Sequence, residues 1–156
     1  MANLIAAKSV YQAIASALDK QQYRYKSDPD NLCFYLGFST DCLNIELHIS
    51  IDPQHEVFHF ISILPFTFPE DKLLEGAMVA TIANHNLIHG NFDFDFSTGN
   101  MLFKLTNYYL NGYINEDCVV SLLEITLHTV NQYDDQFLAV AKGYMSISDF
   151  IDKENV

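Results

Sequence analysis

The chain has 156 residues, of which 49% are hydrophobic and 18% charged, a composition typical of one globular domain and too apolar for a disordered protein. Eight basic residues stand against twenty acidic ones, giving a net charge of -12. A surface of this sign repels phosphate groups, so neither nucleic acid nor an anionic membrane is an expected partner. No stretch reaches the roughly 18 consecutive apolar residues that a membrane-spanning helix needs.

The cysteines predict a reducing environment. Cys33, Cys42 and Cys118 are odd in number and show no metal-binding spacing, so we expect three reduced thiols. The first twenty residues lack the basic start, continuous apolar run and cleavage site of a secretion signal. We therefore expect a cytoplasmic protein.

In the first third of the chain the hydrophobic period changes from about 3.6 to 2. Apolar residues recur every three or four positions from Asn3 to Lys20, which predicts an amphipathic helix. The polar segment 21–31 is expected to be a loop. Strict alternation then predicts strands over Leu32–Phe38, Leu43–Ile51 and Val57–Leu64, joined by turns into an antiparallel meander.

A helix is expected after the third strand. Pro65 is predicted to end that strand, and Thr67 and Glu70 have the spacing of a capping box. The helix should run from Pro69 to His89, with Gly90 placed to end it.

A second hairpin and a long helix follow. Alternating apolar residues predict strands over Phe92–Phe96 and Met101–Leu105. Asn115 is a favourable N-cap for a helix that ends near Lys142 and Gly143. A short helical tail is expected over Ile147–Lys153.

These elements predict an α+β fold with a mostly antiparallel sheet of about five strands flanked by helices, in the order α-β-β-β-α-β-β-α. Groups of strands alternate with single helices, whereas a parallel sheet would require strict strand-helix-strand repetition. No linker, repeat or low-complexity segment divides the chain, so residues 1–156 are predicted to form a single domain.

Several short motifs resemble the bacterial YbjN-domain family, which is similar in fold to the class I type III secretion chaperones. The motifs are Leu64-Pro65, Phe68-Pro69-Glu70, Ala83-Asn84-His85-Asn86, Gly90-Asn91-Phe92-Asp93-Phe94-Asp95, Gly99 and Phe103-Lys104. They occur in the family's order, they coincide with the predicted element boundaries, and the resemblance covers residues 3–145.

The resemblance implies a compact sheet with flanking helices, frequent dimerisation, and a role in binding partner proteins or in regulation. It implies no catalytic residues. The residue after Phe103, commonly arginine in the family, is Lys104 here, so this chain lacks the bidentate donor that arginine would provide.

Two groups of histidines are candidate metal ligands. His85 and His89 are four apart on a predicted helix, as in the HExxH motif, but the glutamate of that motif is absent. Capping of the helix end, or packing, is the favoured interpretation of this pair. Nothing in the pattern fixes His48, His55 and His59 as ligands, so no metal site is predicted.

The sequence offers no recognisable catalytic or nucleotide-binding motif. There is no G-x-S-x-G, no P-loop and no G-x-G-x-x-G. Asp93, Asp95 and Ser97 begin like a calcium loop, but Gly99 comes one position late and Lys104 stands where the last ligand should be. We therefore expect no catalytic residue and no cofactor, and we do not expect an enzyme.

Aromatic residues suggest a surface for a partner. Tyr133, Phe137 and Tyr144 lie on one stripe of the long predicted helix and are the candidate partner-binding residues. The end of a strand at Tyr108-Tyr109-Leu110 is a second such place. The same rings would equally serve an internal core, so both interpretations stay open.

The resulting hypothesis is a non-catalytic protein-binding module, chaperone-like or a regulatory adaptor, that acts through a sheet or helix surface as a homodimer. The alternative is a regulator that senses a small ligand in a pocket between helix and sheet. An unrecognised enzyme ranks third.

Overall fold

A computed structural model describes residues 2–154 as a six-stranded antiparallel sheet with helices packed on one face. The strand order is β1-β2-β3-β4-β6-β5. None of the helices in this range is both long and apolar enough to cross a membrane. The elements are α1 (Ala2–Lys20), β1 (Tyr25–Asp28), β2 (Cys33–Ser39), β3 (Asn44–Asp52), β4 (Val57–Thr67), the 3-10 turn η1 (Glu70–Lys72), α2 (Leu73–Asn86), β5 (Asn91–Asp95), β6 (Asn100–Tyr108), α3 (Glu116–Ala141) and α4 (Ile147–Glu154).

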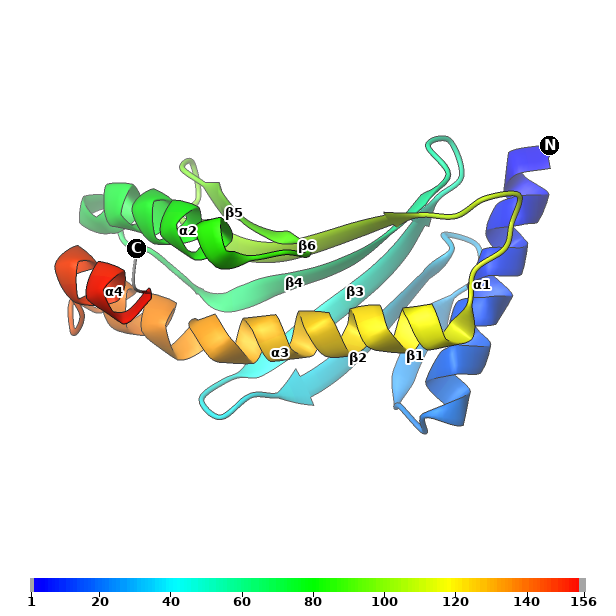
Figure 1. The fold of residues 1–156 in the computed structure, drawn as a ribbon, viewed down its shortest axis with the longest axis horizontal. Helices are drawn as coiled ribbons and strands as arrows, with labels where there is room; N and C mark the ends of the chain where they lie inside the picture. Colours follow the sequence, from blue (N-terminus) through cyan, green and yellow to red (C-terminus); the bar gives the residue numbers. More distant parts are fainter. Residues whose placement is uncertain (1, 155–156) are drawn as a thin grey trace.

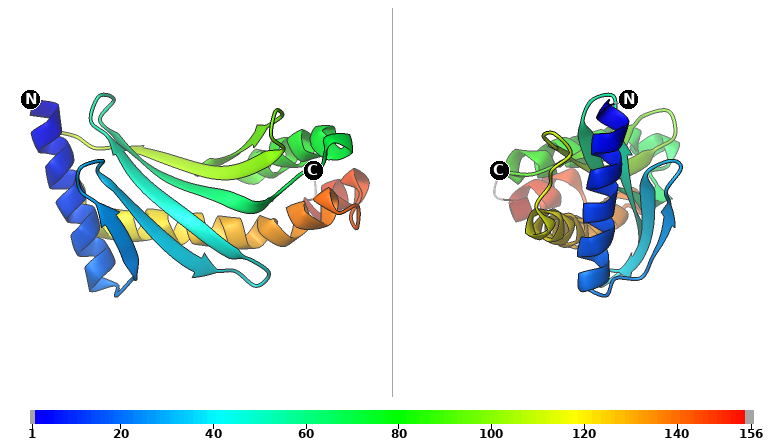
Figure 2. Two further views of the ribbon diagram at one scale, coloured as in Figure 1. Left: turned by 180° about the vertical axis from the view of Figure 1, so that it is seen from behind. Right: turned by 90° about the vertical axis from the view of Figure 1, so that its right-hand side faces the viewer.

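The molecule has two layers. The long helix α3 runs along the sheet, α1 stands across the end next to β1 and β2, and α2 and α4 lie at the opposite end (Figure 1). Seen from behind, β2 and β3 lie in front of α3, and no helix covers them from that side (Figure 2). One face of the sheet is therefore buried under helices and the other is open.

The core lies between these two layers. Along β3, Ile45, Leu47, Ile49 and Ile51 are buried, whereas the residues between them reach the open face. Each fully buried large apolar side chain contributes about 1.5–3 kcal/mol relative to exposure. The largest fully buried side chains are Tyr109, Tyr133, Phe34, Phe58, Phe60, Phe103, Phe137, Phe150, Ile14, Leu18, Ile45 and Leu47.

The α+β class and the antiparallel sheet are confirmed, but the expected number of strands was slightly wrong. The sheet has six strands because β1 forms within the segment that was predicted to be a loop. Its four residues are too polar to show an apolar alternation. Pairing with β2 and packing of the Tyr25 ring against Phe34, with 5.5 Å between ring centroids, hold it in place.

The boundary between β4 and α2 also differs from the prediction. Pro65 lies inside β4, where its missing N–H costs little because pairing with β3 has ended at Ile63 and the pairing with β6 is irregular between Ile63 and Thr67. Thr67 is thus in a strand and forms no capping box. The helix α2 begins at Leu73 after η1 and ends at Asn86, before Gly90.

Both ends of α3 agree with the sequence-based expectation. The Asn115 side chain accepts a hydrogen bond from the Asp117 N–H at 2.8 Å, which caps the first turn. The helix ends at Ala141, and Gly143 follows with a φ of 75°. The expected tail helix is α4.

Candidate functional site

The sheet has an open edge at the end of β2. The strand β1 pairs with residues 33–36 only, while residues 37–39 continue to pair with β3. Because β2 has no other neighbouring strand on that side within residues 2–154, its last three residues form the edge of the sheet there. An open edge of this kind is a template for pairing with another chain.

The hydrogen-bond pattern shows which backbone groups of β2 point away from β3. The Thr40 N–H donates to the Leu43 carbonyl at 2.8 Å, and the Ile51 N–H donates to the Leu32 carbonyl at 3.1 Å. Antiparallel ladders alternate, so every even-numbered residue of β2 bonds to β3 and every odd-numbered one faces away. The N–H and C=O groups of the two odd-numbered residues in the open section therefore point outward from the sheet.

Tight turns keep β1 short. After α1 the chain reverses through Gln22, which has a φ of 58°, and the Tyr23 N–H caps the helix by donating to the Leu18 carbonyl at 3.0 Å. At the other end the Asp28 carboxylate accepts bonds from the Asn31 N–H at 3.1 Å and from its Nδ2 at 2.8 Å. These turns confine β1 to four residues and leave the rest of the β2 edge uncovered.

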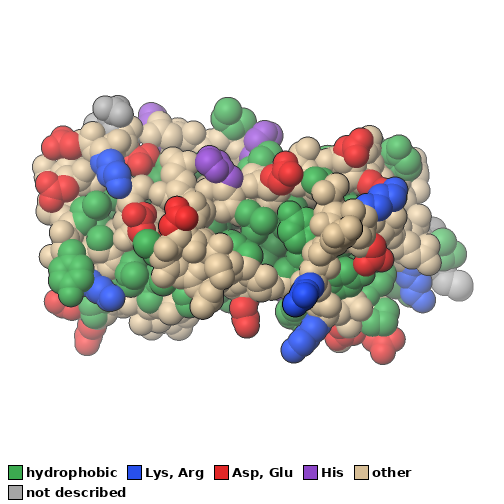
Figure 3. All heavy atoms as spheres, turned by 90° about the horizontal axis from the view of Figure 1, so that it is seen from below, with side chains coloured by type: hydrophobic (Ala, Val, Ile, Leu, Met, Phe, Trp, Pro, Cys, Tyr) green, Lys and Arg blue, Asp and Glu red, His purple; other side chains and the backbone are tan. Residues whose placement is uncertain are grey.

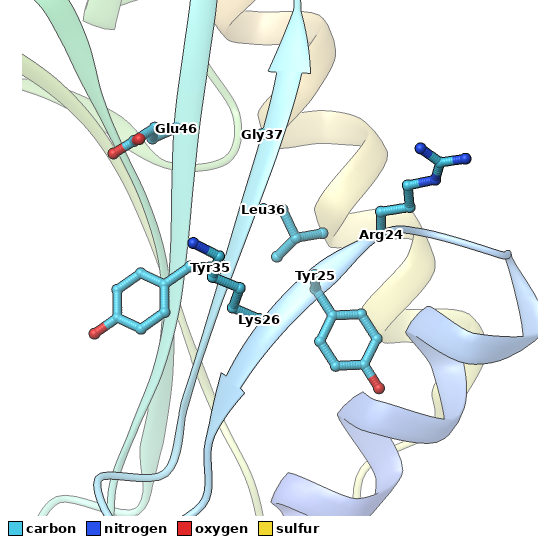
Figure 4. A pocket seen from close by; sticks show the side chains of 7 residues that line it. All are labelled: Arg24, Tyr25, Lys26, Tyr35, Leu36, Gly37 and Glu46. Carbon is cyan, nitrogen blue, oxygen red and sulfur yellow. The ribbon is translucent and has the colours of Figure 1, made fainter.

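A hollow of about 500 Å³ lies at this edge (Figure 4). Tyr25 and Leu36 point toward the helices, whereas Lys26, Tyr35 and Glu46 point to the open face. The hollow therefore offers apolar surface on one side of the edge and charged groups on the other. Its lining residues are Arg24, Tyr25, Lys26, Tyr35, Leu36, Gly37 and Glu46.

The open face of the sheet continues this surface. A second hollow, of about 540 Å³, includes Tyr35, His48, Ile61 and Ile63. The rings of Tyr35 and His48 are stacked with 4.8 Å between their centroids. Tyr35 is 49% exposed and Ile63 is 55% exposed. Aromatic and aliphatic groups surrounded by polar ones are typical of protein interfaces.

The charges on this face come from a few side chains. Burial lowers the pKa of His48 and so favours its neutral imidazole. Lys26 and Glu46 form no ion pair within residues 2–154.

Elsewhere, on the underside of the molecule, apolar side chains gather near the middle with acidic and basic ones around them (Figure 3).

The structure separates the three aromatic residues that the sequence suggested as a partner surface. Tyr133 is 1% exposed and Phe137 is fully buried, and both rings pack against Phe150 of α4. Tyr144 lies beyond the end of α3 and is 82% exposed. The periodicity that joined them is therefore explained by core packing for two of the three, and only Tyr144 is directly accessible.

The histidines do not assemble into a metal site. His85 lies in the last turn of α2 and His89 lies beyond the helix. His48 and His59 lie on the open face, where His59 Nδ1 is 2.8 Å from Thr106 Oγ1, and His55 pairs with Asp52 in a turn. Among the residues that the structure describes, no three His, Cys, Asp or Glu side chains are placed to hold a metal ion.

The open edge is the feature that sequence reasoning missed. It depends on how far β1 extends, and the four polar residues of β1 carry no strand pattern. One signal was available: Gly37 interrupts the strongly apolar run of β2. A glycine inside a strand often marks a place where another backbone approaches closely.

No family model matches the sequence, and no curated protein matches it either. Among solved structures, the chain is similar to YbjN from E. coli, a proposed transcription regulator, with a TM-score of 0.62 and 8% identity over 85% of this chain and 92% of that one. It is also similar to a structure of the ExsC-ExsE complex, with a TM-score of 0.55 and 13% identity over 81% of this chain and 91% of that chain. The protein therefore has a YbjN-like, secretion-chaperone-like fold, as the resemblance predicted.

Proposed function

We propose that this protein is a non-catalytic protein-binding module, chaperone-like or a regulatory adaptor, that pairs an extended segment of a partner with the open edge of β2. The observation that carries the proposal is the mismatch between β1 and β2, which leaves residues 37–39, within the described part of the chain, without a paired strand on the side away from β3. A segment added there would gain main-chain hydrogen bonds from the edge and specificity from its alternate side chains.

The chemistry of the hollow supports this use. An added strand places its side chains alternately toward the two faces of the sheet. On one face they would meet Tyr25 and Leu36, and on the other they would meet Tyr35 and Glu46. The similar ExsC-ExsE structure is that of a complex, and YbjN is a proposed regulator, so both are consistent with an adaptor. The odd number of cysteines, all three unpaired, supports action in the cytoplasm.

The test uses a proline at the edge. Ser39→Pro removes an edge N–H without removing a bond to β3, whereas Ser39→Ala removes only the hydroxyl. Affinity capture from a lysate of the native host, followed by mass spectrometry, should recover the same stoichiometric partner with the wild type and with Ser39→Ala. Ser39→Pro should lose that partner. Equal recovery by both variants would show that the edge is not used.

We further propose that the protein forms a homodimer through the outer face of α2. One side of α2 is buried, yet the opposite side is also apolar, with Leu74 65% exposed. Exposed apolar patches on a protein surface are typical of interaction sites. A second copy would cover this face with its own, as two-fold symmetry requires. The exposed side also carries Met78, Ala77, Thr81 and Ile82, which line a shallow hollow.

Light scattering after size-exclusion chromatography tests the dimer. The wild type should have twice the mass of one chain, and Met78→Glu should reduce the mass to that of a monomer. Ile88→Glu, at an exposed position outside the helix, serves as the control and should leave the dimer intact. A monomeric wild type, or a dimer that survives Met78→Glu, would refute this arrangement.

Two further surfaces remain from the sequence-based hypotheses. Tyr144 is accessible to a partner as the structure stands, whereas use of Tyr133 and Phe137 would require α4 to move away.

A ligand-sensing regulator was expected to have its pocket between helix and sheet. The hollows around Gly37 and His48 lie instead at the sheet edge and on its open face, which favours a protein partner.

A further inference from the structure

Neither the space around Gly37 nor its backbone conformation requires a glycine at this position. A Cβ added at this position would meet no atom within 4 Å, and its φ lies outside the left-handed region that favours glycine. The pairing of β2 with β3 is continuous, so Gly37 does not mark a bulge. Glycine inside a strand costs roughly 0.5–1 kcal/mol relative to alanine. Glycine inside a strand is also found where another molecule approaches the backbone closely.

The residue directly across from Gly37 on β3 is Glu46. Glu46 is exposed, points to the open face beside Tyr35, and has no ion-pair partner in the part of the chain that the structure describes (Figure 4). Tyr35 of β2 is paired with Lys26 of β1, and Glu46 lies on β3, on the other side of β2. Tyr35 is therefore on the strand between the Lys26 ammonium group and the Glu46 carboxylate. Because Gly37 has no side chain, no side chain at this position lies between Glu46 and the open edge.

We propose that a partner segment paired with the β2 edge places a lysine or arginine opposite Gly37, and that this side chain crosses the bare glycine to form an ion pair with Glu46. The inference rests on the proposed function. The apolar stem of the basic side chain would lie along Tyr35 while its head meets the carboxylate. The net charge of -12 also favours a basic segment over an acidic one. Gly37 and Glu46 together thus select the partner.

Two synthetic peptides test the pairing. The probes are acetyl-Thr-Val-Thr-Arg-Thr-Val-Thr-amide and the same peptide with citrulline, which has the shape of arginine without its charge. Titration of ¹⁵N-labelled protein should give tighter binding of the arginine peptide by about two- to fivefold, with shifts at Gly37 and Glu46. Equal affinities would refute the proposed ion pair but leave edge pairing intact. Absence of binding by both peptides would refute edge pairing itself.

Three variants test which residues cause the preference for the arginine peptide. Glu46→Gln should abolish the difference between the two peptides, and Glu124→Gln, an exposed glutamate on α3, should preserve it. Gly37→Thr fills the gap but keeps the edge N–H, so it should bind the citrulline peptide as the wild type does and lose the preference for arginine. If Gly37→Thr or Glu46→Gln retained that preference, the proposed route across Gly37 would be wrong.

Discussion

At the scale of single residues, the structure distinguishes glycines that the fold requires from those that it does not. Gly99 has a φ of 71°, and a Cβ there would lie 2.3 Å from the carbonyl oxygen of Phe68. Gly143 has a φ of 75° but would meet no atom within 4 Å. The two positions therefore separate the effect of backbone conformation from that of a steric clash.

We expect Gly99→Ala to lower the free energy of unfolding by about 2–3 kcal/mol, because the clash adds to the cost of a left-handed conformation. Gly143→Ala should cost only about 1 kcal/mol, from the conformation alone. Urea denaturation of both variants measures the difference. Equal losses would mean that the turn at Gly99 relaxes around the added methyl group.

Asp134 predicts a dependence of stability on pH. Burial raises its pKa, the hydrogen bond from Thr40 opposes that shift, and the nearby carboxylates of Asp135 and Asp41 add to the rise. A carboxyl group with a raised pKa binds its proton more tightly in the folded state. Its contribution to stability is therefore complete below the unfolded pKa of about 3.9 and is lost as the pH rises through the folded pKa.

Asp134→Asn should remove this loss. The free energy of unfolding of the variant, minus that of the wild type, should therefore increase as the pH rises from about 4 to 7. Chemical denaturation at a series of pH values measures the gain. Asp152→Asn, at an exposed position on α4, should run parallel to the wild type. A parallel curve for Asp134→Asn as well would contradict the assignment.

At the scale of elements, α4 is held to the domain by one large anchor. Phe150 is fully buried and stacks on Phe137 with 5.8 Å between ring centroids. The Tyr133 hydroxyl of α3 donates a hydrogen bond to the Glu154 carboxylate at 2.8 Å and so connects the end of α4 to α3. Both contacts close the core at the end of α3.

Phe150→Ala should lower the free energy of unfolding by about 3–5 kcal/mol, since it leaves a cavity among aromatic rings. Tyr144→Ala removes an equally large ring from an exposed site nearby and should change stability by less than about 0.5 kcal/mol. Urea denaturation of the pair provides the comparison. A similar loss in the two variants would mean that α4 contributes little to the core.

The elements that the sequence predicted well are those with a one-sided hydrophobic pattern. Apolar residues alternate regularly along β3 and recur every three or four positions along α3. Tertiary contacts agree with these local patterns, so the two elements were predicted correctly. The strand β1 and the passage of β4 through Pro65 could not be predicted, because neighbouring strands decide both. Pairing across a sheet is a non-local property that local sequence patterns do not report.

At the scale of the whole molecule, the same limit applies to the candidate site. An aromatic stripe on a helix looks alike whether it faces a core or a partner, so Tyr133 and Phe137 could not be told apart from Tyr144 by spacing. The open edge arises from the unequal lengths of β1 and β2. The open edge can be recognised only from the assembled sheet, although Gly37, a glycine inside an apolar strand, is a local sign of it.

Amide hydrogen exchange at Gly37 and Ser39 tests the central claim most directly. Both amides should exchange rapidly in the free protein, because they face the open edge, while the Phe38 amide, which bonds to β3, should exchange slowly. Addition of the captured partner should slow exchange at Gly37 and Ser39 selectively. Slow exchange at these two amides in the free protein, or protection that appears only elsewhere in the complex, would contradict the account.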